Sequence, residues 1–180
     1  MRIIAGINKG KRLKAPRGLS IRPTLDKVKG AIFNIIGSRI TDSSVLDLFS
    51  GTGALGIEAL SRGASNCVFV DKKVRYIREN LKVSGFNGRI IKSDVRSAIN
   101  QLDKDGFKFD IVIADPPYKW VGVKNLLSWL KESGILAFPN LVVIEHSRFT
   151  KINHKCVKEK YYGDTVVSVF STEDKKRLSN

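Results

Sequence analysis

Short apolar runs alternate with amphipathic segments along the middle of the chain. The apolar runs predict buried strands, and the amphipathic segments predict helices with one apolar face. The expected strands are residues 45–49, 68–70, 89–91, 109–114 and 141–144, and the expected helices are 53–62, 73–83 and 123–132. Alternation of strand and helix is typical of a parallel sheet that is covered by helices on both faces.

The two ends of the chain add a helix and a hairpin to this pattern. Near the N-terminus, residues 24–36 predict a helix, because Val28, Ile32 and Ile35 form an apolar stripe and Thr24 is a suitable N-cap. Near the C-terminus, two apolar runs around 155–161 and 165–170 have no helix between them. The turn residues Gly163 and Asp164 join these runs, so they predict an antiparallel hairpin at the edge of the sheet.

Charge is uneven along the chain and points to a polyanionic partner. The 180 residues hold 32 Lys and Arg against 17 Asp and Glu, a net charge of +15. Ten of these basic residues and a single acid lie in residues 1–40. Such an excess favours nucleic acid first and an anionic membrane surface second, with solubility alone as the alternative. We therefore expect a basic N-terminal extension over 1–40, holding a hairpin and a helix that contact RNA, and one domain over 41–180.

Other simple signals argue against export, a membrane span or a metal site. No apolar run approaches the roughly 20 residues of a membrane helix, and the first residues do not resemble a signal peptide, so a cytoplasmic location is the default. Cys67 and Cys156 show no paired spacing and are expected to be reduced thiols. His146 and His154 lack metal-ligand spacing, so we predict no metal.

A glycine-rich loop follows the first expected strand. Residues 50–56 match G-x-G-x-x-G between a strand and a helix, an arrangement that brings backbone close to a ligand. A dinucleotide, S-adenosylmethionine and a ligand-free tight turn all remain possible interpretations. Asp47 favours S-adenosylmethionine, because a carboxylate at this strand end would repel a diphosphate and attract an ammonium or sulfonium group. The alternative is that this carboxylate accepts N–H bonds from the loop, and the two roles can coexist.

Acidic residues also follow the second and third expected strands. Asp71 lies 18 positions after Gly53, where a carboxylate can accept both ribose hydroxyls of either cofactor. Asp94 is placed over the same crevice, where it could accept from an adenine amino group while Val95 covers the ring. The N-cap of the next helix is an equally good interpretation of Asp94.

The fourth expected strand ends in Asp115-Pro116-Pro117-Tyr118. Two prolines fix two φ angles and remove two backbone donors, which a turn alone rarely requires. Methylation of an exocyclic amino group on a base does require such a frame, since the lone pair of that nitrogen is delocalised into the ring. The Asp115 carboxylate and the Pro116 carbonyl can hold its two protons, and Tyr118 offers a face for stacking. An ordinary Asp pKa of ~3.9 assigns Asp115 mainly to orientation and charge stabilisation, although it could take a proton after the transfer.

These residues together resemble the S-adenosylmethionine-dependent methyltransferases, and more narrowly the RsmD family of bacterial 16S rRNA guanine-N2 methyltransferases. The resemblance covers nearly the whole chain. It is carried by residues 2–6 and 9–13, 22–28, 46–64, 115–118, 145–147 and 162–165. It implies a Rossmann-like α/β fold with a seven-stranded, mostly parallel sheet and an antiparallel edge strand. It also implies S-adenosylmethionine as the cofactor, and 16S rRNA in the 30S subunit or its assembly intermediate as the partner.

The expected site residues follow from the motifs and the resemblance. The catalytic residues are Asp115, Pro116, Pro117 and Tyr118. The cofactor-binding residues are Asp47, Phe49, Ser50, Gly51, Thr52, Gly53, Asp71, Lys72, Asp94 and Val95. The RNA-binding residues are Lys9, Lys11, Arg12 and Arg22, with a solvated arm as the alternative. We expect a monomer that has no membrane partner.

Three other functions stay open at this point. An adenine-N6 methyltransferase acting on DNA or RNA fits the four-residue motif equally well. A dinucleotide-dependent oxidoreductase fits the glycine loop, and a catalytically silent RNA-binding assembly factor fits the basic extension. Trp120 could cover the acceptor base or pack in a loop, and Glu145 could face the cleft. Glu58 is expected to be a helix residue rather than a ligand.

Overall fold

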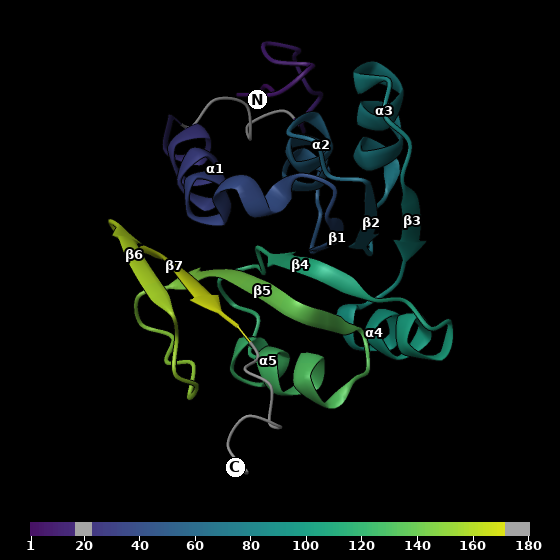
Figure 1. The fold of residues 1–180 in the computed structure, drawn as a ribbon. Coiled ribbons are helices and arrows are strands. Elements are labelled where there is room, and N and C mark those ends of the chain that lie inside the picture. Colours follow the sequence, from purple (N-terminus) through teal and green to yellow (C-terminus); the bar gives the residue numbers. More distant parts are fainter. Residues whose placement is uncertain (17–22, 172–180) are drawn as a thin grey trace.

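The computed structural model describes residues 1–16 and 23–171 of the chain, and side chains from residue 26 onward in the second range. The described part contains one seven-stranded sheet in the order β3-β2-β1-β4-β5-β7-β6 (Figure 1). The strands are β1 Ser44–Leu48, β2 Asn66–Asp71, β3 Arg89–Lys92, β4 Phe109–Ala114, β5 Leu136–Ser147, β6 Lys158–Tyr162 and β7 Thr165–Phe170. The helices are α1 Pro23–Ile36, α2 Ala54–Ser61, α3 Arg75–Ser84, α4 Val95–Lys104 and α5 Val123–Glu132, with a short 3-10 helix over Gly37–Ile40.

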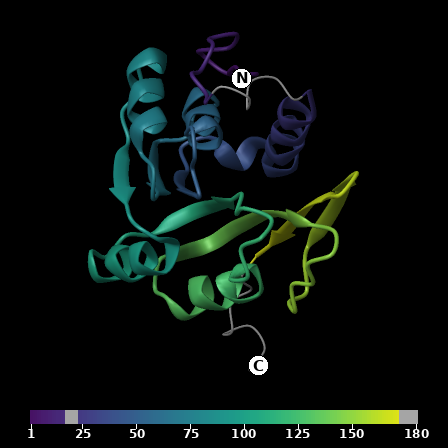
Figure 2. The same ribbon diagram turned by 180° about the vertical axis from the view of Figure 1, so that it is seen from behind.

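Helices cover both faces of this sheet. Helices α1, α2 and α3 lie on one face, and α4 and α5 lie on the other (Figures 1 and 2). Alternate residues of each strand serve the two faces, so that Val45 packs beneath α1–α3 and Leu46 packs against α4 and α5. The α/β fold predicted from the alternation of strands and helices is confirmed. No helix in the described ranges is long and apolar enough to cross a bilayer.

The C-terminal hairpin forms one end of the sheet, as predicted. Strand β7 pairs antiparallel with both β5 and β6, whereas β1 to β5 pair in parallel. Strand β7 thus lies one position in from the edge, which β6 occupies. Gly163 makes the turn between them with a φ of 64°, a conformation that glycine adopts without a steric cost.

Strand β5 is much longer than the pattern predicts, and helix α1 begins one residue earlier. Strand β5 begins at Leu136 rather than at the predicted residue 141. The prediction missed its first part because this part contains Pro139 and Asn140, residue types that are depleted in strands. Its pairing with β4 is irregular in this part. Helix α1 begins at Pro23, a residue suited to a first helical turn. The side chain of Thr24, the predicted N-cap, lies outside the described side chains.

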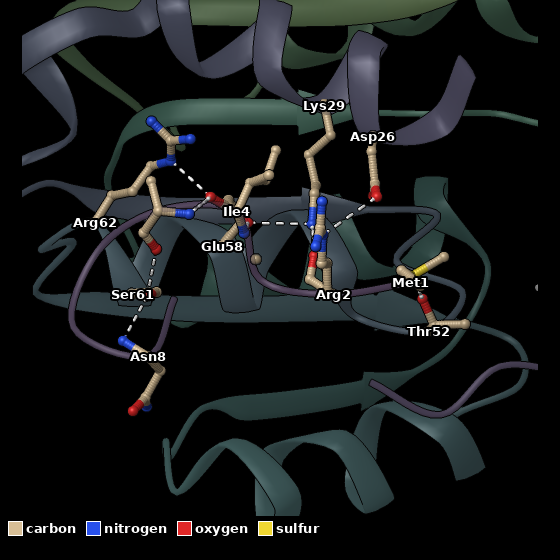
Figure 3. A network of polar contacts seen from close by, with 12 residues as sticks. Met1, Arg2, Ile4, Asn8, Asp26, Lys29, Thr52, Glu58, Ser61 and Arg62 are labelled. Carbon is tan, nitrogen blue, oxygen red and sulfur yellow. Dashed lines mark hydrogen bonds and ion pairs between the residues drawn. The ribbon is translucent and has the colours of Figure 1, made fainter. Parts of the chain in front are cut away.

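Glu58 fastens the N-terminal segment to the sheet domain (Figure 3). This carboxylate on α2 is fully buried, and it forms ion pairs with Lys29 at 3.1 Å and with Arg62 at 2.8 Å. It also accepts the backbone N–H groups of Ile4 and Ala5 at 2.8 and 3.0 Å. Lys29 comes from α1, so one carboxylate joins the first residues, α1 and α2. Glu58 is a residue of helix α2, as expected, and its carboxylate also has this anchoring role.

The first thirteen residues fold back on themselves beside α2. Ile3 donates its N–H to the Lys11 carbonyl at 3.0 Å, and Leu13 donates to the Met1 carbonyl at 3.1 Å. The Asn80 side chain on α3 then holds Lys14 and accepts its N–H at 2.7 Å. The same amide donates to the Thr52 carbonyl at 2.8 Å, so the end of this hairpin is tied to the loop that precedes α2.

Removing the charge of Glu58 should destabilise the fold strongly. The Glu58→Gln variant leaves Lys29 buried at 5% exposure without its counter-ion, and breaking a buried pair in this way costs about 3–5 kcal/mol. Urea unfolding followed by circular dichroism measures the change. Glu79→Gln is the matched control, because its pairs with Arg75 and Lys14 are exposed on the basic side, where such pairs contribute little. Equal losses in both variants would contradict the assigned role of Glu58.

Candidate active site

The sheet has one topological switch point, between β1 and β4. Chain connections leave these two neighbouring strands in opposite directions, which opens a crevice at their carboxyl ends. The parallel register pairs Leu48 with Ala114. The next residues, Phe49 and Asp115, therefore leave the sheet side by side. The pairing brings the predicted glycine loop and the predicted Asp-Pro-Pro-Tyr motif to the same place.

The glycine loop bends sharply and packs tightly on the sheet. Gly53 precedes α2 with a φ of 77°, and Gly51 has a φ of 56°, both in the left-handed region that favours glycine. A Cβ on Gly56 would meet the Phe69 ring at 2.3 Å and the Cys67 sulfur at 2.6 Å. Only a glycine at this position lets α2 approach β2 so closely. The close approach of α2 to β2 at Gly56 therefore fixes the position of the loop above the strand ends.

Asp47 lies beneath this loop and is completely buried. Its Oδ2 accepts the Gly56 N–H at 2.9 Å, the role that the sequence left as an alternative to ligand binding. Its Oδ1 has no hydrogen-bond partner in the described part of the chain. Burial, opposed by the Gly56 bond and assisted by the charge of Asp115, raises the pKa of Asp47 to about 7. An unpaired carboxylate oxygen in this position favours a cation above it.

The two other expected cofactor acids already have backbone partners. Asp71 ends β2, where its carboxylate accepts the N–H groups of Gly51 and Lys73, each at 2.8 Å. Asp94 is the N-cap of α4 and accepts the Ser97 N–H at 3.1 Å, and this bond lowers its pKa. The N-cap interpretation of Asp94 is thus confirmed. Val95 is 5% exposed and belongs to the core on the α4 and α5 face of the sheet.

A cavity of about 210 Å³ lies between the glycine loop, α1 and the end of β4. It gathers five of the residues predicted from sequence together with others from α1, α2 and β5. Its walls are Met1, Asp26, Lys29, Ile32, Phe49, Ser50, Gly51, Thr52, Ala54, Leu55, Asp115 and Glu145. A second cavity of about 350 Å³, lined by Arg39 and Asp110 among others, lies at the amino ends of the strands and holds none of the predicted site residues.

Two carboxyl groups face this cavity from neighbouring strands. Burial raises the pKa of Asp115 to about 6. Burial and the nearby charge of Asp115 raise the pKa of Glu145 to about 8. At neutral pH the pair therefore holds one proton, mainly on Glu145. The environment places the pKa of Asp115 nearer to neutrality than its ordinary value, so this carboxylate can accept a proton as well as orient a ligand.

The rest of the Asp-Pro-Pro-Tyr motif forms a turn at the rim. Pro116 is buried, whereas Pro117 and Tyr118 are exposed. Tyr118 keeps its ring open to solvent at 62% exposure while its hydroxyl bonds Thr165 on β7 at 2.6 Å. Trp120 closes the turn by donating its backbone N–H to the Pro117 carbonyl at 2.7 Å.

Trp120 packs under the loop after β1. Its ring meets the Phe49 ring edge-on at 4.7 Å. It also lies 6.1 Å from the Trp129 ring of α5. The structure thus favours the packing interpretation of Trp120 over a role as cover for an acceptor base.

The basic residues of the N-terminal arm lie apart from the cavity. Lys9, Lys11 and Arg12 are all exposed. The tip of the hairpin bonds Ser61 and Ser84, at the far ends of α2 and α3 from the glycine loop. The length of α2 separates this tip from the cavity by about 12 Å, at about 1.5 Å per residue. Arg22 lies outside the described residues.

Sequence reasoning missed the part of the cavity wall that α1 supplies. Lys29 and Ile32 are one turn apart on α1 and both face the cavity. Ile32 belongs to the apolar stripe that signalled the helix, but nothing in that stripe indicates which cavity it borders. Lys29 precedes Ile32 by three residues, which places both on the same side of α1. A lysine beside an apolar stripe was the available signal.

Three comparisons place the chain among known proteins. Residues 1–171 match the family model described as Conserved hypothetical protein 95. The Bacillus subtilis protein named "Putative rRNA methyltransferase YlbH" is 38% identical, over 94% of this chain and 98% of its own length. The Escherichia coli K12 protein named Ribosomal RNA small subunit methyltransferase D is 34% identical, over 81% of this chain and 74% of its own.

A solved structure shares the whole architecture. Hypothetical protein TTHA0928 of Thermus thermophilus matches with a TM-score of 0.83 and 26% identity. The match covers 96% of this chain and 99% of that chain. The elements that build the cavity are therefore part of a fold that both proteins have in full.

The buried carboxyl group of Asp47 should make the free energy of unfolding depend on pH. The pKa of Asp47 rises from 3.8 to about 7 on folding, so folding favours its protonated form. This contribution is full below pH 3.8 and is lost as pH rises through about 7. Asp47→Asn keeps an acceptor for Gly56 and cannot ionise. Between pH 5 and pH 9, its free energy of unfolding should fall less than that of the wild type.

Urea unfolding at pH 5, 7 and 9 measures this difference. Asp105→Asn is the control, because Asp105 pairs with Arg89 on the surface and should leave the pH dependence of the wild type in place. The same pH dependence in Asp47→Asn and the wild type would refute the raised pKa of Asp47.

Proposed function

The chain belongs to the Conserved hypothetical protein 95 family, the RsmD family of S-adenosylmethionine-dependent methyltransferases, and we propose that it methylates the exocyclic N2 of a guanine in 16S rRNA. The small-subunit assignment rests on the name of its Escherichia coli relative. Action on the 30S subunit or its assembly intermediate, in the cytoplasm and as a monomer, belongs to the same proposal.

The residues around the loop fit S-adenosylmethionine. The buried Oδ1 of Asp47 lies beneath the loop without a hydrogen-bond partner among the described residues, and its negative charge favours a cationic ligand above it. Phe49 to Thr52 supply one wall of the cavity, and Asp71 keeps carboxylate lone pairs for the ribose hydroxyls. Lys72 extends the same strand end, and Asp94 and Val95 open the next helix. When bound, the cofactor supplies an electrophilic methyl group on a sulfonium sulfur.

The cavity shared by Asp115 and the glycine loop is the observation that best supports the proposed methyl transfer. Asp115 and the glycine loop border a single cavity of about 210 Å³. A donor held by the loop and an amino group held by Asp115 would share this space. Holding two reactants together in this way supplies most of the rate in a direct displacement. The backbone frame of Pro116 and Pro117 keeps the Asp115 carboxylate at the strand end.

Asp115 can do two things for the acceptor. Its carboxylate accepts one N–H of the amino group, and the Pro116 carbonyl accepts the other, which turns the nitrogen lone pair toward the methyl donor. The methylated nitrogen then carries a positive charge and must lose a proton. With its pKa raised to about 6, the Asp115 carboxylate is able to take that proton near neutral pH. The base must leave its stack to reach this site, and Tyr118 offers it an exposed ring.

The N-terminal extension is proposed to grip the RNA at a distance from the reacting atoms. Lys9, Lys11 and Arg12 are exposed along the hairpin, and no residue of the hairpin tip lines the cavity. Contacts at the tip therefore suit phosphates that lie several nucleotides from the acceptor base. The proposed extension over 1–40 and domain over 41–180 also share one core, in which Ile3 packs with Ile57.

Two aspartates should separate donor binding from turnover. Asp71→Ala should weaken S-adenosylmethionine binding in calorimetry, because it removes the ribose acceptor. Asp115→Asn should keep donor binding and lower turnover by about 10²-fold or more, because the amide cannot take the proton. Turnover is measured with labelled donor and 30S particles from cells that lack the modification. Nucleoside digestion then reports where the label lies.

The digest also decides between bases. Label in N2-methylguanosine supports the proposed function, and label in N6-methyladenosine would show an adenine-N6 methyltransferase instead. Full activity of Asp115→Asn, or loss of donor binding in that variant alone, would overturn the two assignments. Asp105→Asn, at an exposed surface pair, controls for the loss of an aspartate.

Salt dependence should report the grip of the hairpin. The Lys9→Ala/Lys11→Ala variant should bind rRNA with a slope of log Kd against log salt that is smaller by about 1.4, at about 0.7 for each phosphate that is no longer neutralised. Lys104→Ala/Lys131→Ala is the matched control, since these two lysines are exposed on α4 and α5, on the other face of the sheet. An unchanged slope in the hairpin variant would remove the hairpin from RNA binding.

A further inference from the structure

Glu145 lies beside Asp115 in the cavity wall and has no role in the mechanism above. Strands β4 and β5 pair Ala114 with Ile144 in parallel register, so the next residues of the two strands are neighbours. Ile113 and Val143 face α1–α3, and side chains two positions further along a strand face the same way. Asp115 and Glu145 thus direct their carboxyl groups to one face, where both border the cavity.

Neither carboxyl group is neutralised by the protein around it. In the described part of the chain, no side-chain hydrogen bond or ion pair engages Glu145 or Asp115. Among the described side chains, the charged groups that line the cavity with Glu145 are Asp115, which follows β4, and Lys29 and Asp26 from α1. On β7, its neighbour Val167 is apolar.

The lysine of the cavity is already committed to other partners. Lys29 donates to the Arg2 carbonyl at 2.5 Å and pairs with Glu58 at 3.1 Å. Asp26 is likewise paired with Arg2, at 4.0 Å. The cavity therefore presents two adjacent carboxyl groups whose hydrogen-bonding capacity is left for a ligand. Such an arrangement opposes stability, since partly buried polar groups without partners cost free energy.

The two groups differ in protonation at neutral pH. Glu145 remains protonated up to about pH 8, whereas Asp115 ionises near pH 6. A neutral carboxyl group presents an O–H donor beside a carbonyl acceptor, and an ionised one presents acceptors only. The cavity wall thus offers three groups in a row. The Asp115 carboxylate is an acceptor, the Glu145 carbonyl oxygen is a second acceptor, and the Glu145 O–H is a donor.

We propose that Glu145 is a specificity-determining residue that binds the N1–H and O6 edge of guanine while Asp115 holds the neighbouring 2-amino group. The edge of guanine carries an amino donor, the N1–H donor and the O6 acceptor in that order, which matches the wall group by group. Adenine with its 6-amino group at Asp115 would place the N1 lone pair and then a C–H group against Glu145. One hydrogen bond would remain in place of two. This inference rests on the proposed guanine-N2 function and adds the residue that selects the base.

Two substitutions at Glu145 test the role. The amide of Glu145→Gln keeps a donor and an acceptor but does not titrate, so it should retain kcat/KM within a few-fold at pH 7. Glu145→Ala removes both bonds to the base and should lower kcat/KM on the order of 10²-fold. Calorimetry should show unchanged S-adenosylmethionine binding in both variants, because Glu145 faces the acceptor.

The pH profile distinguishes this role from a structural one. Wild-type kcat/KM should fall about tenfold per pH unit above pH 8 as Glu145 ionises, and Glu145→Gln should lack this fall. Glu132→Gln, at the exposed end of α5, should behave as the wild type. Melting temperatures establish that each variant is folded before its rate is compared.

Two results would overturn the assignment of Glu145. One is wild-type kcat/KM in Glu145→Ala, and the other is an alkaline fall that Glu145→Gln retains. In both cases kcat/KM is measured as the rate at which label enters N2-methylguanosine. Either result would therefore leave the proposed function intact. Label that never enters N2-methylguanosine, even with the wild type, would refute the proposed function itself and with it the inference.

Discussion

The parallel pairing of β1 with β4 is the constraint on which the site depends. Its register sets Phe49 beside Asp115, so the loop proposed for the donor and the motif proposed for the acceptor meet at one strand end. If the two strands slipped by one residue, the loop and the motif would no longer lie side by side, since a slip turns every side chain to the opposite face. The tight packing of Gly56 on Phe69 then fixes the loop above the strands.

The charges of the molecule are divided between the site and the arm. A chain with a net charge of +15 places three carboxyl groups with raised pKa values, Asp47, Asp115 and Glu145, at the ends of adjacent strands. Their burial raises the pKa of each, which suits ligands that bring a cation or a row of N–H donors. The basic hairpin stays in solvent, where it can meet phosphates. Glu58 joins these two parts through one buried carboxylate.

Sequence patterns predicted the elements of this fold well wherever local signals were strong. Strand β4 and helix α5 have the predicted limits, because an unbroken apolar run and a stop at Gly134 define them. The start of β5 was missed, since Pro139 hides it. The glycine loop and Asp115 were placed correctly because each belongs to a motif at a strand end. Asp94 carried two equal interpretations, and only the contact with Ser97 identified the cap.

The contribution of α1 to the cavity could not be predicted in this way. Lys29 and Glu58 are 29 positions apart along the chain, and no periodicity links them. Their pairing depends on how α1 crosses the sheet, which is a property of the packed structure. Glu145 was recognised only as the end of a strand, and its position beside Asp115 required the register of β4 and β5.

A crystal structure with S-adenosylmethionine bound is the decisive test of the proposal that one cavity holds the methyl donor against Asp115. We expect the cofactor beside Phe49 to Thr52, with its sulfur directed toward the Asp115 carboxylate. A cofactor at the amino ends of the strands beside Arg39, or one with its sulfur turned away from Asp115, would refute the proposal.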